Sequence, residues 1–185
     1  MKRSLRVIGL AALVALPAMA SAQESRPVSF GVSGGLSLPV GDLGDGADAG
    51  YNITGHIGYK PASFTNLSFR GDVSFDRWGL KNNDDVSFRS LGVTANAIYA
   101  FPQTTPGVIR PYVLGGVGMY NSKSTIDVGN NSADVGSDTN VGVQAGAGIN
   151  FQLSGFATFL EAKFVNVFTE GNSLTFIPIT FGIKF

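Results

Sequence analysis

The chain ends on residues 175–185, and from residue 177 onward these residues alternate between two kinds of side chain. One parity carries large apolar residues and the other carries small or polar ones, which are Pro178, Thr180, Gly182 and Lys184. A period of two is typical of a β-strand whose two faces meet different surroundings. An apolar strand left unpaired at a sheet edge would promote aggregation. We therefore expect this strand to pair on both sides.

The same alternation recurs in seven further segments. Two parities are clear in all but residues 108–120, where Tyr112 and Leu114 fall on one parity and Val113, Val117 and Met119 on the other, so the faces of that segment stay unassigned. No stretch from residue 23 onward has a helical period, and 25 of the 185 residues are glycine. We predict an all-β chain with strands in residues 28–38, 51–60, 67–76, 91–101, 108–120, 141–151, 156–164 and 175–185.

The connections between these segments predict the topology. We expect compact turns at 60–63, 101–107 and 152–155, and longer loops rich in Gly, Asn and Asp at 41–50, 78–85 and 121–140. The last of these loops is expected to be mobile. Consecutive strands joined in this way give an eight-stranded antiparallel up-and-down barrel, in which the last strand closes onto the first.

The N-terminus has the pattern of a secretory signal peptide. Lys2, Arg3 and Arg6 precede an apolar run from residue 7 to residue 16, and 20–22 reads as an A-x-A cleavage site. A membrane anchor would need about 20 apolar residues, twice the length of this run. We predict a signal peptide at 1–22 and one barrel domain at 23–185. The mature domain has ten basic and 13 acidic residues, about −3 in net charge, which gives no indication of a nucleic-acid partner.

The polar parity indicates which solvent surrounds the barrel. It is dominated by Ser, Gly, Thr, Asn and Gln, and only 14% of the chain is charged, whereas a water-facing surface carries about 25–35% charged residues. Small polar groups suit a crowded interior, so we expect the apolar side chains to face lipid; a soluble exported barrel is the alternative. Aromatic residues also fall into two groups, as in the girdles of a transmembrane barrel. They are Phe30, Tyr59, Tyr99, Phe101, Tyr112, Phe151, Phe156 and Phe185 near the compact turns, and Tyr51, Phe75, Trp78, Phe88, Tyr120 and Phe168 near the long loops.

Several segments carry a family resemblance. The signal peptide, the strand with residues 33–36, the stretch 110–118, the stretch 161–164 and the C-terminal strand are similar to the small outer-membrane β-barrel domain family of Gram-negative bacteria, which includes OmpA- and OmpX-type barrels. The resemblance covers essentially the whole mature chain. It implies an outer-membrane location, with both termini and the compact turns in the periplasm and the long loops outside.

The resemblance also implies partners. Phe181, Gly182, Ile183 and Phe185 resemble the C-terminal signal by which the barrel-assembly machinery recognises its substrates. Outer-membrane lipid and lipopolysaccharide are expected around the barrel, and the outer loops could contact an unidentified extracellular ligand. Pro178 cannot donate to a strand ladder, so we expect a bulge or local break beside it.

Four charged residues share the parity expected to face inward. Arg70 and Asp72 lie on one strand, and Glu161 and Lys163 on another. Charges enclosed in a narrow lumen must pair, because an unpaired buried charge is costly. We predict a lumen charge network that fills the barrel, with a gate or ligand site as the alternative.

The lone histidine and the acidic loops are the candidates for chemistry. Small outer-membrane lipid A deacylases and palmitoyltransferases use a His with a Ser, but the residue two positions after His56 is Gly58 rather than Ser. We therefore interpret His56 as a packed lumen residue and predict no catalytic residue. The acidic residues do not match the calcium-loop pattern, so no metal or cofactor is predicted. They are Asp42, Asp45, Asp48, Asp127, Asp134 and Asp138.

These features leave three hypotheses for function. We favour an outer-membrane barrel with a structural or surface-interaction role through its outer loops and without catalysis. An eight-stranded barrel has room for its own side chains or one small ligand, which argues against a general porin. A narrow channel or carrier for small or apolar solutes and a lipid-modifying enzyme are the alternatives.

Overall fold

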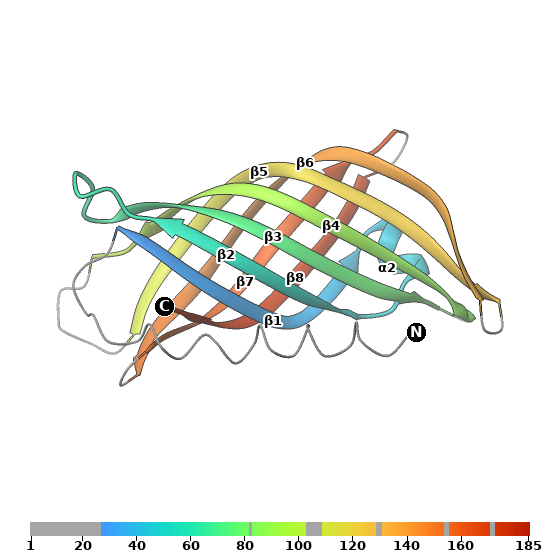
Figure 1. Cartoon of the computed structure of the whole chain (residues 1–185), viewed down its shortest axis with the longest axis horizontal. Coiled ribbons are helices and arrows are strands. Elements are labelled where there is room, and N and C mark those ends of the chain that lie inside the picture. The colour runs from blue at the N-terminus through green and yellow to red at the C-terminus, as the bar shows by residue number, and fades with distance from the viewer. Residues whose placement is uncertain (1–26, 82, 103–108, 129–130, 154–155, 171–172) are drawn as a thin grey trace, which may run out of the picture.

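The chain forms a closed barrel of eight antiparallel strands in chain order (Figure 1). The computed structural model describes residues 27–81, 83–102, 109–128, 131–153, 156–170 and 173–185, so the signal peptide predicted at 1–22 lies outside the described residues. The predicted all-β, up-and-down barrel is confirmed. The strands are β1 (Val28–Val40), β2 (Gly50–Tyr59), β3 (Leu67–Leu80), β4 (Asn83–Ala100), β5 (Ile109–Val128), β6 (Asn131–Leu153), β7 (Phe156–Phe168) and β8 (Ser173–Lys184).

The last strand pairs with the first, as the sequence predicted. The β1–β8 ladder runs from the pair Gly31 and Lys184 to the pair Val40 and Thr175. Pro178 lies inside β8 without a bulge, but the β7–β8 ladder skips the two pairs nearest to it and resumes in the same register. The expected local break is therefore present on that side, because proline has no N–H to donate.

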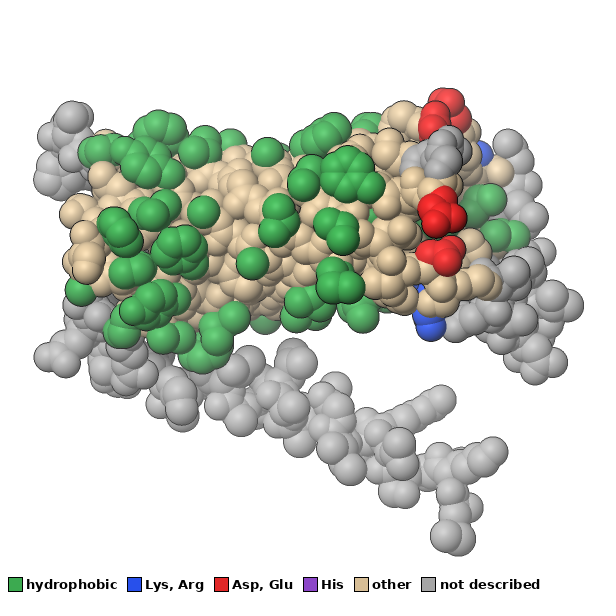
Figure 2. Space-filling view, turned by 90° about the horizontal axis from the view of Figure 1, so that it is seen from above, with side chains coloured by type: hydrophobic (Ala, Val, Ile, Leu, Met, Phe, Trp, Pro, Cys, Tyr) green, Lys and Arg blue, Asp and Glu red, His purple; other side chains and the backbone are tan. Residues whose placement is uncertain are grey.

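The outer wall of the barrel is apolar. On β5 the outward residues from Ile109 to Met119 are hydrophobic or small, and Met119 is 59% exposed. About 9–11 residues of a tilted strand cross a bilayer, which matches this length. Figure 2 shows hydrophobic side chains spread over the wall, with acidic side chains gathered near one end. The faces of β5, left open by its sequence pattern, are now assigned: Val113, Val117 and Met119 face outward.

Two hairpins project beyond the apolar wall at one end, which we call the hairpin end. The segments 78–85 and 121–140 were predicted as loops, and this was wrong: β3 and β4 continue to Leu80 and Asn83, and β5 and β6 pair as far as Val128 and Asn131 (Figure 1). Composition misled the prediction, because Ser, Asn and Asp have low strand propensity but pair well when the neighbouring strand supplies the ladder. Gly136, with φ 75°, is the extra residue where the β5–β6 register shifts, as in a G1 bulge.

The opposite end of the barrel, where β1 begins and β8 ends, is called the terminal end. Its connections at residues 60–66 and 101–108 are longer than the two-residue connections 81–82 and 129–130 of the hairpin end. At the hairpin end, the described β1–β2 connection carries a short helix, α2 (Asp42–Gly46), and its Leu43 packs against the barrel core. None of the helices among the described residues is long and apolar enough to cross a membrane.

Four of the aromatic residues assigned to the girdles face the interior instead. Trp78, Tyr112 and Tyr120 are buried, and Phe88 is partly buried with its ring stacked on Trp78 at 5.9 Å. A narrow barrel has room for such rings only where the neighbouring strands carry no side chain beside them. A Cβ added to Gly92 would lie 2.7 Å from Tyr120, and one added to Gly142 would lie 2.8 Å from it. Inward glycine therefore explains much of the high glycine content.

Candidate functional site

Arg70 lies at the centre of the polar interior. Its Nη1 and Nη2 donate to the two carboxylate oxygens of Glu161 at 2.8 Å each, which joins β3 to β7 across the lumen. The same guanidinium donates from Nε to Asp72 Oδ1 at 2.8 Å and from Nη2 to Asp72 Oδ2 at 3.0 Å. The planar guanidinium fork suits two carboxylates at once, which makes these charge-assisted bonds strong.

Asp72 and Glu161 each have further partners. Lys163 Nζ lies 3.7 Å from Asp72 Oδ2 and 3.9 Å from Glu161 Oε1. The Asn96 amide donates to Asp72 Oδ2 at 3.1 Å, and the Tyr112 hydroxyl donates to Glu161 Oε2 at 2.7 Å. The four charged residues on the inward parity are thus brought into one cluster, which we call the charge network: Arg70, Asp72, Glu161 and Lys163. Its two cations and two carboxylates balance.

His56 extends the charge network towards β1. Its Nδ1 lies 3.1 Å from Asp72 Oδ1, and its Nε2 lies 2.9 Å from the Ser33 hydroxyl. The ring of Phe159 meets the imidazole edge-on at 5.4 Å. Ser33, His56 and Asp72 therefore form a hydrogen-bonded Ser–His–Asp chain. Sequence reasoning missed the serine because it searched two positions after the histidine, whereas Ser33 comes from the neighbouring strand.

A second set of polar side chains lies on the same inward faces. Asp76 Oδ1 accepts from the Ser37 hydroxyl and from the Asn52 amide, both at 2.8 Å. Tyr120 donates its hydroxyl to Gln144 Oε1 at 3.2 Å, and Gln144 donates to Thr94 at 3.0 Å and to Asn96. These bonds satisfy polar groups that would otherwise be costly to bury.

Towards the hairpin end the lumen becomes apolar. Trp78 meets Phe176 edge-on at 5.0 Å, and Tyr120 meets the same ring at 6.4 Å. The Trp78 indole donates to the Ser37 carbonyl at 3.1 Å. We call this cluster the aromatic layer; its buried members are Ala47, Trp78, Tyr120, Val165, Val167, Leu174 and Phe176. The charge network thus spans the lumen from β3 to β7, and the aromatic layer lies beyond it towards the hairpin end.

The residues of the predicted assembly signal end the barrel wall. Phe181 and Phe185 face outward and are 54% and 51% exposed, whereas Gly182 is buried under the Phe159 ring. Phe185 exchanges both backbone hydrogen bonds with Phe30. Their geometry fits a closing strand, and recognition by the assembly machinery stays a prediction.

The acidic segments do not come together as a metal site in the described part of the chain. There, no group of three His, Asp or Glu side chains lies close enough to hold an ion. Asp42 and Asp45 lie in the first turn of α2, while the side chains of Asp127 and Asp134 lie outside the described residues.

Solved structures with the same fold were found by comparison. Neisserial surface protein A superposes with a TM-score of 0.63 at 16% identity, over 86% of this chain and 96% of that one. A major outer membrane protein from Thermus thermophilus gives a TM-score of 0.56 at 10% identity, over 86% and 99%. The outer membrane enzyme PagL gives 0.50 at 16% identity, over 85% and 97%. At these identities the likeness shows the fold alone.

A family model places the sequence more directly. The model of the outer membrane protein beta-barrel domain matches residues 8–185, which is nearly the whole chain. A search of curated protein sequences finds no match. The closed barrel, its apolar wall and this match agree, and the protein is located in the outer membrane. The chain belongs to the outer-membrane β-barrel domain family.

Proposed function

We propose that the protein is a sealed scaffold in the outer membrane that holds its two projecting hairpins outside the cell, where they contact extracellular molecules, and that it performs no catalysis. The filling of the lumen carries this proposal. Arg70 and Glu161 bridge the barrel with two bonds of 2.8 Å, and Trp78 and Phe176 pack across it towards the hairpin end. Such an interior suits a rigid support better than a conduit.

The conductance of the purified protein tests the sealed lumen. We expect the folded mature protein to give no stepwise currents in planar lipid bilayers. Stable single-channel currents, altered by Glu161→Ala, would instead support the narrow channel or carrier. The gel shift between unboiled and boiled samples verifies folding of each preparation.

Orientation is the second requirement of the proposal. The resemblance to small outer-membrane barrels implies periplasmic termini, and β1 begins and β8 ends at the terminal end. The hairpin end, whose two hairpins extend beyond the apolar band, would then face outward. The chain has no cysteine, so single cysteines give clean labelling. Asp138→Cys in the β5–β6 hairpin should react with a membrane-impermeant maleimide on intact cells, whereas Ser63→Cys at the terminal end should react only after lysis. The reverse pattern would refute the orientation.

Lipopolysaccharide is the expected partner at the outer edge of the wall. The strand registers place Arg77 opposite Arg89 and Arg89 opposite Lys123, all on the outward parity. These three side chains form an outward row of cations at one edge of the wall, and phosphate groups of lipopolysaccharide are suitable ligands for such a row. In vesicles with lipopolysaccharide in the outer leaflet, we expect Arg77→Gln with Lys123→Gln to weaken co-purification of lipopolysaccharide; Lys60→Gln, at the terminal end, should not.

One observation favours a second candidate function, a lipid-modifying hydrolase. Ser33, His56 and Asp72 have the hydrogen-bond order of a catalytic triad. The neighbour PagL is described as an enzyme. However, Asp72 is shared with Arg70 and Asn96. A cavity of about 230 Å³ between β1, β2 and β3 is lined by His56 but not by Ser33. Ester hydrolysis abolished by both Ser33→Ala and His56→Ala would establish the enzyme; lipid A of unchanged mass in expressing cells agrees with the scaffold.

A further inference from the structure

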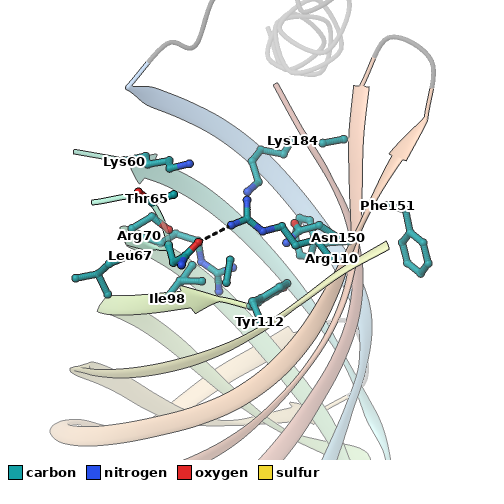
Figure 3. A pocket seen from close by; sticks show the side chains of 15 residues that line it. Lys60, Thr65, Leu67, Arg70, Ile98, Arg110, Tyr112, Asn150, Phe151 and Lys184 are labelled. Carbon is teal, nitrogen blue, oxygen red and sulfur yellow. Dashed lines mark hydrogen bonds between the residues drawn. The ribbon is translucent and has the colours of Figure 1, made fainter. Parts of the chain in front are cut away.

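A cavity of about 290 Å³ opens at the terminal end of the lumen. Its wall includes Lys60, Arg70, Arg110, Tyr112, Asn150 and Lys184 (Figure 3). These residues come from β3, β5, β6, β8 and the connection after β2, so the cavity is enclosed by most of the barrel circumference. Arg70 and Tyr112 also bind Glu161, so the charge network forms the inner end of the cavity.

The cavity carries more positive charge than the structure neutralises. The charge network behind it is balanced, because its two cations are matched by Asp72 and Glu161. Lys60, Arg110 and Lys184 add three further cations to the same space. Among the residues that the structure describes, none of these three side chains forms an ion pair with a carboxylate.

Arg110 is held in position with donors to spare. Its Nη2 donates to Asn66 Oδ1 at 3.0 Å, the bond dashed in Figure 3, and its Nε donates to the Phe101 carbonyl at 3.4 Å. A guanidinium has five N–H donors, so these two bonds to described residues leave others directed elsewhere. A fixed guanidinium binds oxyanions well, because little side-chain freedom is lost on binding.

The shape of the site limits the ligand. The cavity is at the small end of the volumes usual for ligand pockets, and the Arg70–Glu161 bridge closes its inner end. Attraction between unlike charges is stronger in such an enclosed space than in water. The interior position also separates the site from the lipid-facing wall.

We propose that this cavity is a binding site for a small oxyanion, a phosphate or a compact carboxylate, taken from the aqueous compartment at the terminal end. Lys60 and Lys184 supply ammonium groups to its wall, and Arg110 supplies a guanidinium held by Asn66. The site is separate from the hairpins and from the Arg77–Lys123 row.

Calorimetric titration of the folded mature protein in detergent with inorganic phosphate tests the site. We expect one saturable site, weakened roughly tenfold or more by Arg110→Gln with Lys184→Gln. Lys81→Gln removes one exposed cation at the hairpin end, outside both proposed sites, and should leave binding unchanged. The gel shift on boiling confirms that each variant is folded.

A second arm distinguishes a soluble anion from a lipid headgroup. Phosphate titrated into protein in phosphatidylcholine nanodiscs should bind as in detergent, and phosphatidylglycerol nanodiscs should leave the fitted affinity unchanged. Competition by phosphatidylglycerol would assign the site to lipid phosphate and overturn the soluble ligand. No saturable binding, or equal loss in Lys81→Gln and in the double variant, would overturn the site itself.

Discussion

Arg70 and Glu161 lie 91 residues apart in sequence and meet across the lumen through two parallel hydrogen bonds of 2.8 Å. This bridge connects β3 to β7, strands that are not neighbours in the barrel. It therefore adds a fixed link across the interior, in addition to the ladders that run around the wall.

Removal of one end of this bridge should be costly. Glu161→Ala leaves the Arg70 guanidinium with Asp72 alone and the Tyr112 hydroxyl without its acceptor. Truncating one partner of a buried pair costs about 3–5 kcal/mol. Urea unfolding in phospholipid vesicles should show a loss of that size. Glu170→Ala, at an exposed position after β7, is the matched control, and a similar loss in both variants would contradict the structural role of the bridge.

Substitution of an inward-facing glycine by alanine should destabilise the barrel. A Cβ on Gly92 would lie 2.7 Å from both the Ser74 hydroxyl and the Tyr120 ring, so Gly92→Ala should destabilise the barrel by about 1–3 kcal/mol. Gly55 faces outward and has open space around its Cβ position, so Gly55→Ala should have little effect. The comparison uses the free energy of unfolding in vesicles. Tolerance of both changes would show that Tyr120 is not packed as described.

An arginine introduced on the lipid-facing wall should destabilise the barrel most near the middle of the bilayer. Val113 is 40% exposed in the middle of the apolar span of β5, which runs from Ile109 to Met119. Val113→Arg should cost about 2–4 kcal/mol in a bilayer. Asp138→Arg, on the projecting part of β6, should change stability by less than about 0.5 kcal/mol. A harmless Val113→Arg together with free solubility of the protein would mean that the wall faces water.

The C-terminal residue should matter more for assembly than for stability. Phe185→Asn keeps both backbone bonds to Phe30, so folding in detergent should be nearly unchanged. If residues 181–185 are read by the assembly machinery, the outer-membrane level of the variant in cells should fall several-fold. Phe30→Asn is the matched control, because Phe30 is paired opposite and is similarly exposed. Equal losses for both variants would argue against a recognition signal.

The wall of this barrel was predictable because strand alternation is a local property. Outside β5, whose faces its sequence pattern left open, parity gives the inward and outward positions, and with them the inward placement of Arg70, Asp72, Glu161 and Lys163. The strand order and the closure followed from the succession of strands and connections. The pairing partners could not, because parity gives no register between strands. Bridging of both carboxylates by Arg70 depends on distances that only the closed barrel determines.

The interior aromatic residues show a second limit. Trp78 and Tyr120 were assigned to girdles because of their position along the strand, yet both lie on the inward parity. The sequence feature that indicates an inward ring is glycine at inward positions of the neighbouring strands, such as Gly92 and Gly142 beside Tyr120. That relationship crosses strands, so a reading of one segment at a time misses it. The projecting hairpins were missed for the same reason, since their ladders depend on the partner strand.

The position of Trp78 gives the molecule a spectroscopic reporter of its own. It is the single tryptophan in the chain, 1% exposed, and it is anchored by its indole N–H to the Ser37 carbonyl of β1. The emission maximum of Trp78 should shift to shorter wavelength only when β1 and β3 have taken their places in the closed barrel. Its fluorescence should then be protected from quenching by iodide in water and by brominated lipid in the membrane. The time course of this one emission band should therefore distinguish insertion of an open sheet into the membrane from closure of the barrel.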